Sequence, residues 1–388
     1  MKDKICLVVQ RYGLEVNGGA ELQCRLFAEH LLSRYDVEVV TTKALDYMSW
    51  KNEYSQDEEV INGVRVRRFG VDRQRKAREF NNINGKLLRE GLTPEEEHEW
   101  LDKQGPLCPQ LIRYIRDNKD NYKVFIFFAY LFYPTVKGLP EVAEKAIFIP
   151  EAHNEPFLKM DIIRRLFYMP RAFFFNTEEE KNFVHRKFCN SDIPYDIGGI
   201  GIEEPASADP DDFKKKFGLD NYLLYIGRID EGKNCHILFN YFKEYKKRNG
   251  GNLKLALIGK PVIEIPKDDD IVALGFLAEQ DKTNGLTGAK MLVLPSEYES
   301  LSMVVLEAMT VGTPVLVNGK CEVLKGHCIK SNGALYYTNY FEFEAEVNYL
   351  LQNQEEKEAI TANARKYVDD NYKWSVVIGK LTDLIERI

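Results

Sequence analysis

Short apolar runs alternate with stretches of helical apolar spacing along almost the whole chain. Runs typical of buried strands occur at 4–9, 37–41, 64–69, 124–128, 146–149, 172–176, 223–226, 253–258, 271–274, 291–294 and 314–317. Helical spacing is seen at 21–32, 303–311, 342–351, 355–371 and 374–388. Strands that alternate with helices in both halves predict an α/β protein with two Rossmann-like parallel-sheet domains that face each other across a cleft.

The segment 193–210 changes in character and predicts the linker between the domains. It carries Gly198, Gly199, Gly201 and Pro205, followed by a short acidic run. We therefore expect an N-terminal domain at 1–202 and a C-terminal domain at 203–371. The last segment, 372–388, contains an amphipathic helix whose apolar face must pack on another part of the chain.

The stretch 291–318 predicts a strand, a loop, a helix and a second strand, with Gly312 ending the helix. Its loop follows a parallel strand, which is where open α/β sheets bind ligands. The backbone amides of Ser300, Leu301, Ser302 and Met303 lie at the start of the helix and favour an anion such as a phosphate. Two carboxylates, Glu299 and Glu307, flank them and accept hydrogen bonds from hydroxyl groups. Alternatively, Glu299 is an ordinary loop acid and Glu307 a partner of the helix dipole in the first turn of the helix.

Two further strand ends carry groups suited to a phosphate. Gly18 and Gly19 precede the first helix, and glycines there let a ligand approach the backbone closely. A plain turn would show the same residues. After the strand at 223–226, Arg228 and Lys233 lie five residues apart, so both side chains can face one polyanion. Two surface cations are the alternative.

His153 follows the strand at 146–149 in the sequence Glu151-Ala-His-Asn-Glu-Pro156. The chain has six histidines, and a histidine in a polar loop just beyond a strand end is a better candidate for a site than for the core. The triplet Asp268-Asp-Asp270 suggests a metal site at first sight. Because it precedes a strand and sits in a polar turn, we expect no metal there.

Composition narrows the class of protein. The 388 residues are 44% hydrophobic and 29% charged, with a net charge of −7, which argues against nucleic acid as the main partner. Seven scattered cysteines without a C-x-x-C pair indicate neither disulfides nor zinc, and fit the cytoplasm. The longest apolar run, 124–133, is too short to cross a bilayer, and we see no secretory signal. Arg164, Arg165 and Arg171, interleaved with aromatic residues, suggest peripheral membrane contact or simply solvated arginines beside a buried strand.

Three sets of residues resemble family 4 of the retaining glycosyltransferases, which have the GT-B fold. The first is Pro295-Ser296, Glu299, Leu306-Glu-Ala-Met309 and Gly312-Thr-Pro-Val315, although Ser300–Met303 replaces the usual Gly-Phe-Gly-Leu. The second is Gly227-Arg228 with Lys233, and the third is Gly18-Gly19 with Glu21. The resemblance covers essentially the whole chain and is weakest at 70–123.

The resemblance implies sugar transfer from a nucleoside diphosphate, with retention at the anomeric carbon and without a metal or cofactor. Arg228, Lys233, Gly18, Gly19 and the amides of 300–303 would bind the diphosphate, and Glu307 the ribose. The catalytic residues would be His153 and Glu299, and both would lie beside the transferred sugar. The nucleobase would lie against Gly259, Lys260, Phe276 and Leu277, and the last helix would cross back to the first domain.

The implied partners are a nucleotide-sugar donor and a saccharide or lipid-linked saccharide acceptor, in the synthesis of a cell-surface polysaccharide or glycoconjugate. We expect a cytoplasmic protein, with the inner face of the membrane as its point of peripheral contact. Two other classes stay open: a nucleotide-sugar epimerase or hydrolase of the same fold, and a non-catalytic nucleotide-sugar binding protein. Release of a free sugar or an epimer without any acceptor would favour the first of these.

Overall fold

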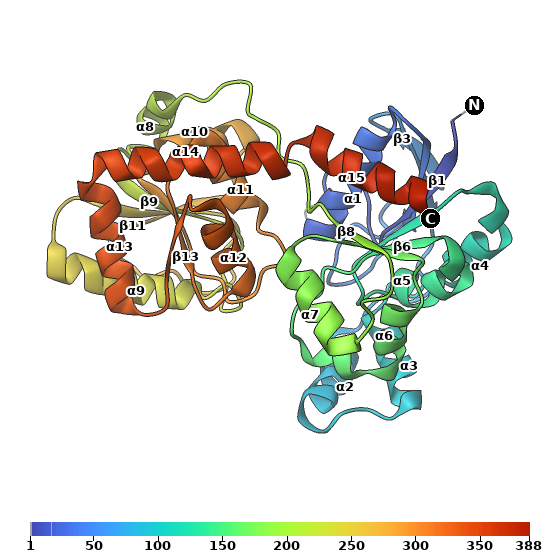
Figure 1. The fold of residues 1–388 in the computed structure, drawn as a ribbon. Helices are drawn as coiled ribbons and strands as arrows, with labels where there is room; N and C mark the ends of the chain where they lie inside the picture. The colour runs from blue at the N-terminus through green and yellow to red at the C-terminus, as the bar shows by residue number, and fades with distance from the viewer. Residues whose placement is uncertain (1, 17) are drawn as a thin grey trace. The chain divides into compact units, whose positions relative to one another are not determined.

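The computed structural model describes residues 2–16 and 18–388. The chain divides into two compact units, shown in Figure 1. Unit 1 comprises Met1–Ile200 and Val377–Ile388, and unit 2 comprises Gly201–Val376. Each unit has its own parallel sheet with helices on both faces, so the prediction of two Rossmann-like α/β domains is confirmed. The domain boundaries predicted at 202/203 and 371/372 stay predictions.

The sheet of unit 1 has eight strands in the order β3-β4-β2-β1-β5-β6-β7-β8. All neighbours pair in parallel except β3 and β4, which form an antiparallel hairpin at one edge. Asn62 and Gly63, both with positive φ, make the turn of that hairpin. The strands are β1 (Lys4–Val8), β2 (Asp36–Thr42), β3 (Glu58–Ile61), β4 (Val64–Phe69), β5 (Phe125–Phe128), β6 (Ala146–Ile149), β7 (Ala172–Phe175) and β8 (Tyr195–Ile197).

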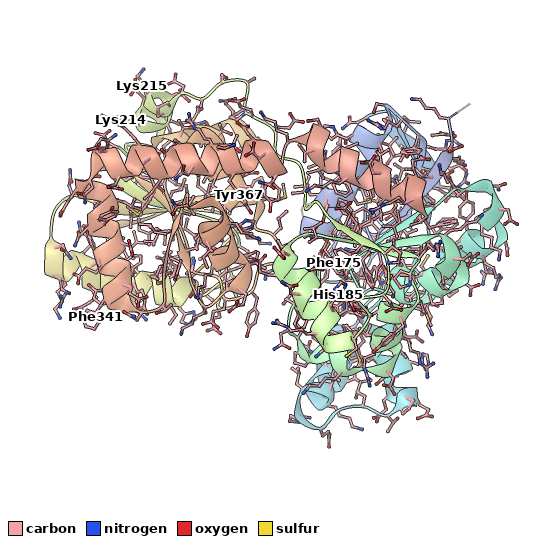
Figure 2. The ribbon with its side chains drawn as sticks, viewed as in Figure 1. Phe175, His185, Lys214, Lys215, Phe341 and Tyr367 are labelled. Atoms are coloured by element: carbon pink, nitrogen blue, oxygen red, sulfur yellow. The ribbon has the colours of Figure 1, made fainter. Side chains whose placement is uncertain are left out.

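The core of unit 1 is unusually aromatic because β5, β6 and β7 contribute phenylalanines that are buried on both faces of the sheet. Helix α7 covers β7, and the rings of His185 and Phe175 meet edge to face at 5.6 Å (Figure 2). The helices are α1 (Gly19–Leu31), α2 (Ala77–Glu90), α3 (Pro94–Gln104), α4 (Pro109–Asp117), η1 (Lys119–Asn121), α5 (Tyr133–Gly138), η2 (Leu139–Lys145), η3 (Pro156–Lys159), α6 (Asp161–Arg164), η4 (Arg165–Tyr168) and α7 (Glu178–Phe188).

The sheet of unit 2 has six parallel strands in the order β11-β10-β9-β12-β13-β14. The strands are β9 (Tyr222–Ile226), β10 (Lys254–Ile258), β11 (Ile271–Gly275), β12 (Met291–Leu294), β13 (Val315–Asn318) and β14 (Leu335–Tyr337). The helices are α8 (Pro210–Phe217), α9 (Cys235–Asn249), α10 (Glu279–Gly288), α11 (Met303–Val311), α12 (Glu322–Ser331), α13 (Tyr340–Gln352) and α14 (Gln354–Asn371).

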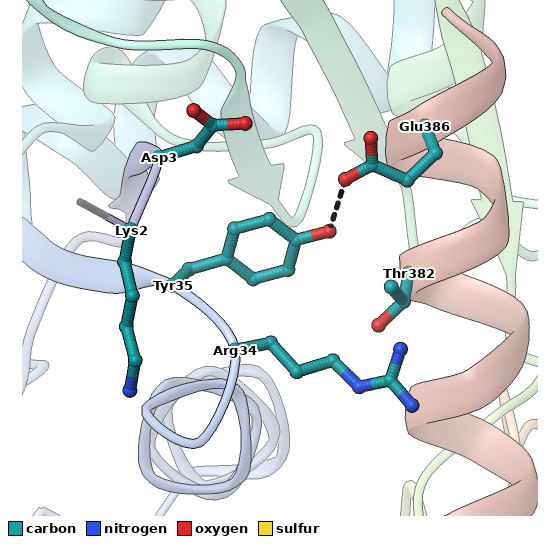
Figure 3. A pocket seen from close by; sticks show the side chains of 6 residues that line it. All are labelled: Lys2, Asp3, Arg34, Tyr35, Thr382 and Glu386. Atoms are coloured by element: carbon teal, nitrogen blue, oxygen red, sulfur yellow. Dashed lines mark hydrogen bonds between the residues drawn. The ribbon is translucent and has the colours of Figure 1, made fainter.

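The last helix, α15 (Trp374–Arg387), begins in unit 2, and its residues from Val377 onward belong to unit 1. The expectation that the C-terminal helix returns to the first domain is therefore confirmed. Val377, Leu381 and Leu384 are buried. Near the end of the helix, the Tyr35 hydroxyl donates to the Glu386 carboxylate at 2.8 Å (Figure 3), and this bond ties the helix to the loop after α1.

The linker prediction for 193–210 is wrong in part. Its first residues form β8, which pairs with β7 at the edge of the unit 1 sheet, and its last residue starts α8. Gly198 and Gly199, which suggested a linker, instead donate their backbone N–H groups to the carbonyl oxygen of Phe175. The short strand escaped detection because Tyr195–Ile197 has only three residues, too few for a clear alternating pattern.

Candidate functional site

The strand order of unit 2 reverses between β9 and β12, which are neighbours in the sheet. From β9 the chain proceeds outward to β10 and β11, and from β12 it proceeds in the opposite direction to β13 and β14. Open α/β sheets bind ligands beyond the carboxyl ends of their strands at such a reversal. The two loops that leave this point are 227–234 after β9 and 295–302 after β12.

These two loops are joined by an ion pair between predicted site residues. The Lys233 ammonium donates to Glu299 Oε1 at 2.7 Å, across the reversal of strand order. The side chains keep 31% and 14% of their exposure, respectively, so both reach solvent. The structure thus brings together a cation predicted for the diphosphate and a carboxylate predicted for the sugar, although 66 residues separate them in sequence.

Asp230, which sequence reasoning passed over, organises the loop after β9. Its carboxylate accepts the backbone N–H of Lys233 at 2.8 Å and pairs with the guanidinium of Arg228. The Arg228 side chain remains 65% exposed. The Tyr225 hydroxyl donates to the Arg228 carbonyl at 2.7 Å and fixes the backbone at the strand end. The backbone of Arg228 is therefore held in place, whereas its guanidinium is exposed to solvent.

The start of α11 matches its prediction, since the helix spans Met303–Val311 and ends at Gly312, which has φ of 77°. The N-cap residue Ser302 is left-handed, with φ of 68°, and its side chain caps no backbone N–H. The Ser302 hydroxyl is buried and has no hydrogen-bond partner among the described residues. The amides of the first turn of α11 thus have no side-chain cap, and uncapped amides at the start of a helix favour a bound anion.

His327 supports the loop that contains Leu301, and the sequence around His327 did not predict this role. Its Nε2 lies 2.8 Å from the Leu301 carbonyl oxygen, and its Nδ1 lies 3.1 Å from the Tyr367 hydroxyl. Because a carbonyl oxygen accepts only, Nε2 carries the proton and Nδ1 accepts from the tyrosine. The ring is fully buried, and burial lowers the pKa of His327 to about 4. A neutral histidine therefore holds the amides of 300–303 in place.

Glu307 lies in the second turn of α11 and not in the first, so the alternative of a first-turn dipole partner is wrong. Its carboxylate accepts from the ammonium of Lys282, on α10, at 3.0 Å. Burial works to lower the pKa of Lys282, but Glu307 and Glu279 outweigh it and raise the pKa. Lys282 is thus a charged, half-buried partner of Glu307 that the sequence did not predict.

The residues predicted for the nucleobase lie at the same edge of the sheet, after β10 and β11. Gly259 has φ of 143°, and a Cβ there would stand 1.9 Å from the carbonyl oxygen of Gly227. The loops after β9 and β10 therefore touch backbone to backbone, which only glycine permits. Lys260 follows on the exposed side, and beyond β11 Phe276 is 77% exposed, with Leu277 next to it.

In unit 1, Gly18 and Gly19 lie at the start of α1, as predicted. Gly18 is the N-cap residue in an extended conformation, and no side chain caps the helix. A Cβ at Gly18 would meet the carboxylate of Glu21 at 2.0 Å, whereas one at Gly19 would meet nothing within 4 Å. Glu21 accepts from Arg11 Nε at 2.8 Å, and both side chains are buried. This ion pair occupies one side of the glycine turn.

His153 lies in the loop after β6 and pairs with Glu155. Burial works to lower the pKa of His153, but the carboxylate of Glu155 outweighs it and raises the pKa. The residue before it, Ala152, donates its backbone N–H to Glu180 at 2.7 Å. Glu180 also accepts the N–H of Asn176 at 2.8 Å, and so joins the loops after β6 and β7.

Thr177 and Glu180 have the spacing of a capping box at the start of α7. Thr177 does accept the Glu180 backbone N–H at 3.2 Å, but the Glu180 carboxylate also reaches across to Ala152. Burial raises the pKa of Glu180 to about 7. Glu151, which has φ of 54° and a buried oxygen without a partner among the described residues, also has its pKa raised by burial, with Glu21 and Glu180 adding to the effect.

The acidic triplet 268–270 lies at the opposite edge of unit 2, before β11. Asp268 accepts the backbone N–H of Asp270 at 2.9 Å, and Asp270 pairs with Lys246 at 2.9 Å. Within residues 2–16 and 18–388, no group of three or more His, Cys, Asp or Glu side chains is arranged to hold a metal ion. The same part of the chain has no helix that is long and apolar enough to cross a membrane.

The two doubly wound units and the returning helix define the GT-B fold, and solved structures of this class match the whole chain. Sucrose-phosphate synthase of Thermosynechococcus elongatus aligns with a TM-score of 0.72 at 14% identity, over 100% of this chain and 99% of that one. HepE of Anabaena, solved in complex with UDP and glucose, aligns with a TM-score of 0.72 at 14% identity, over 100% of both chains.

A family model matches a range that lies within unit 2. Residues 209–367 match the model of the family described as glycosyl transferases group 1, and this range contains Arg228, Lys233, Glu299 and Glu307. An uncharacterized glycosyltransferase of Methanocaldococcus jannaschii is 28% identical over 216 residues, which cover 52% of each chain. The chain thus spans about half the length of the curated relatives it matches.

Proposed function

We propose that the protein is a retaining glycosyltransferase of family 4, which moves a sugar from a nucleoside diphosphate to an acceptor hydroxyl without a metal ion or cofactor. The observation that carries this proposal is the Lys233–Glu299 pair beside the exposed Arg228, at the point where the strand order reverses. The family match of 209–367 covers all three residues and supports it.

The arrangement meets the main physical demand of the reaction, which is the negative charge that the departing diphosphate gains. In our proposal, Arg228 and Lys233 bind that charge together with the uncapped amides of 300–303, as fixed electrostatic groups do in other enzymes. Glu299 accepts hydrogen bonds from the sugar hydroxyls and Glu307 from the ribose. Gly259, Lys260, Phe276 and Leu277 border the nucleobase. His153 and the Gly18–Gly19 turn of unit 1 keep the roles that the resemblance gives them.

The proposed chemistry needs no enzymatic nucleophile. The bond between the anomeric carbon and the diphosphate oxygen breaks, and the acceptor oxygen bonds to the same face of that carbon. The proton of the acceptor hydroxyl passes to the leaving phosphate oxygen, so charge and atoms balance. We further propose a saccharide or lipid-linked saccharide as the acceptor, in cell-surface polysaccharide or glycoconjugate synthesis at the cytoplasmic face of the membrane.

Calorimetric titration tests the donor site. We would titrate UDP, GDP, ADP and dTDP into the protein with magnesium, and again with EDTA. We expect one diphosphate to bind equally well in both buffers, and the preferred one names the base. Binding that requires magnesium would overturn the metal-independent mechanism, and no binding by any of the four would overturn the donor site itself.

A product assay then separates transfer from the other two classes of activity. The protein is incubated with the nucleotide sugar that corresponds to the preferred base, with and without a set of saccharide acceptors. We expect a glycosylated product only when an acceptor is present. Free sugar or an epimer formed without an acceptor would identify a hydrolase or an epimerase. Tight binding without any conversion across the acceptor set would identify a binding protein.

A further inference from the structure

The last residues of the connection from β6 to β7 in unit 1 form a surface that takes no part in the proposed donor site. After the loop of His153, the chain forms η3, α6 and η4 in succession before it enters β7. In residues 160–170 the apolar side chains Ile163, Leu166 and Phe167 are buried. Arg164, Arg165, Tyr168 and Met169 are exposed. This connection is therefore amphipathic, with arginines and large side chains on its outer face.

Helix α7 adds further positive charge beside this face. The ring of Phe167 stacks on Phe188, at the end of α7, with centroids 4.1 Å apart, and Tyr168 meets the same ring edge on at 6.2 Å. Exposed Arg186 and Lys187 directly precede Phe188. We call the outer face formed by Arg164, Arg165, Tyr168, Met169, Arg186 and Lys187 the basic face.

The charge of this face runs against that of the chain. Residues 159–171 contain four basic side chains and one acidic one, whereas the whole protein carries a net charge of −7. The one acid, Asp161, pairs with Arg164 at 3.4 Å. No ion pair of Arg165 is present in the described part of the chain. Exposed basic residues that lack acidic partners attract an anionic surface within the Debye length.

The exposed Tyr168 and Met169 indicate which kind of anionic surface fits. Tyrosine is enriched at membrane–water interfaces, where its ring reaches the acyl boundary and its hydroxyl stays wet. Arginines bind lipid phosphates and contribute to membrane affinity through the negative surface potential. A nucleic acid offers the same charge, but it has no acyl region to receive the exposed Tyr168 and Met169. We propose that the basic face docks unit 1 on the anionic headgroups of a lipid bilayer.

This proposal gives the connection between β6 and β7 two tasks. Its first residues, 151–155, hold His153 at the carboxyl end of β6, and its last residues lie at the bilayer. The link to a lipid-borne acceptor rests on the proposed function, whereas membrane docking itself does not. A binding experiment without any nucleotide therefore tests the docking surface independently of the reaction.

The experiment compares vesicles of phosphatidylcholine alone with vesicles that also contain phosphatidylglycerol, at two salt concentrations. Wild-type protein should sediment with the phosphatidylglycerol vesicles, and binding should weaken as the salt concentration rises. The variant R164E/R165E should bind about tenfold more weakly or worse, because each charge reversal replaces attraction by repulsion. Tyr168→Ser should bind more weakly to a smaller extent and with unchanged salt dependence.

The matched control is K214E/K215E on α8 of unit 2 (Figure 2). Like Arg164, Lys214 has one acidic partner, Asp220 at 2.8 Å, and like Arg165, Lys215 forms no ion pair in the described residues. We expect this variant to bind vesicles about as well as the wild type. Melting temperature and nucleoside-diphosphate affinity, measured for both double variants, verify that each is folded.

An environment-sensitive dye supplies a second readout of the same contact. Of the seven cysteines, all within the described residues, Cys189 is exposed and the other six are buried. Because Cys189 follows Phe188, a dye on its thiol should shift to the blue with phosphatidylglycerol vesicles and stay unchanged with phosphatidylcholine. Equal loss of binding in both double variants, or no binding by the wild type, would overturn the proposal. Tighter binding of a duplex oligonucleotide than of vesicles at the same salt concentration would overturn it too.

Discussion

Units 1 and 2 both carry acids beyond the carboxyl ends of parallel strands, but the surroundings of those acids differ. In unit 2, Glu299 pairs with Lys233 and Glu307 with Lys282, and each pair joins two elements at the solvent-facing edge. In unit 1, Glu180 is buried and accepts two backbone N–H groups. Burial raises the pKa of Glu180.

The difference assigns different work to the two edges. The guanidinium of Arg228 is exposed and the side chain of Lys233 is partly exposed, so both can turn toward an incoming anion at small cost, because ion pairs that reach solvent contribute little to stability. A buried carboxylate that accepts two N–H groups cannot move without leaving those groups unsatisfied. We infer that the unit 2 edge supplies charge to a ligand, and that the unit 1 edge holds the backbone around His153 in a fixed shape.

The largest effect that we expect concerns the glycines of the two edges. Gly259→Ala in unit 2 should cost more than about 3 kcal/mol, because the new Cβ meets a backbone oxygen at 1.9 Å and φ is 143°. Gly19→Ala in unit 1 should change stability by less than about 1 kcal/mol, since nothing lies within 4 Å of its Cβ. Urea unfolding midpoints measure both. Similar costs would contradict the backbone contact between the loops after β9 and β10.

The second effect is the acid sensitivity of unit 2 through His327. Its pKa is about 4 in the folded protein and about 6.5 in the unfolded chain, so the unfolded state binds more protons between these values. The stability that His327 contributes is complete above pH 6.5 and is lost as the pH falls toward 4, by about 3 kcal/mol in total. The test is urea unfolding at pH 7 and pH 4 for the wild type and His327→Gln. Parallel losses in the two proteins would show that His327 is not the sensor.

The third effect concerns the affinity of unit 2 for a nucleoside diphosphate. Arg228→Ala should weaken binding by roughly 1.5–3 kcal/mol, the usual worth of a charge-assisted hydrogen bond, or about ten- to hundredfold. Lys215→Ala, which removes an exposed cation from α8, is the control and should leave the affinity unchanged. An unaltered affinity in folded Arg228→Ala protein would exclude this side chain from the site.

The sequence was sufficient for the parts of the molecule that depend on local pattern. The bounds of α11 and its end at Gly312 follow from apolar spacing and capping chemistry. The return of α15 to unit 1 was implied by the family resemblance, because an amphipathic face alone does not say which unit it packs against. The Asn62-Gly63 pair is a hairpin signal from which β3, the first strand of the hairpin, could have been predicted. No strand was predicted there because the residues of β3 are half-exposed and form no apolar run.

The partners of the predicted site residues were beyond the reach of the sequence. Lys282 reaches Glu307 from another helix, and His327 reaches Leu301 from 26 residues away. Neither contact has a fixed spacing in the chain, because tertiary packing alone brings the groups together. Glu180 did have a local signal, the capping pattern with Thr177, but that pattern explained only its backbone N–H and not the destination of its carboxylate.

The smallest effect that we predict tests Glu180 as a positioning residue in unit 1. Glu180→Gln leaves one good acceptor for two backbone N–H groups, so the loop that holds His153 should loosen. Under the proposed function, we expect activity at pH 8 to fall about tenfold, which corresponds to about 1.4 kcal/mol in the barrier. Glu178→Gln, at an exposed position in the first turn of the same helix, is the control and should be neutral.

The pH profile distinguishes positioning from a general loss of stability. Because the pKa of Glu180 is about 7, the ionised form that best accepts both N–H groups accumulates as the pH rises through 7. Wild-type activity should therefore contain a step that rises near pH 7 and that is missing in Glu180→Gln.

The same raised pKa means that Glu180 binds protons more tightly in the folded state, so its contribution to stability falls as the pH rises from 4.5 to 7. Activity and stability thus respond to this one ionisation in opposite directions, and a merely structural residue would change both together.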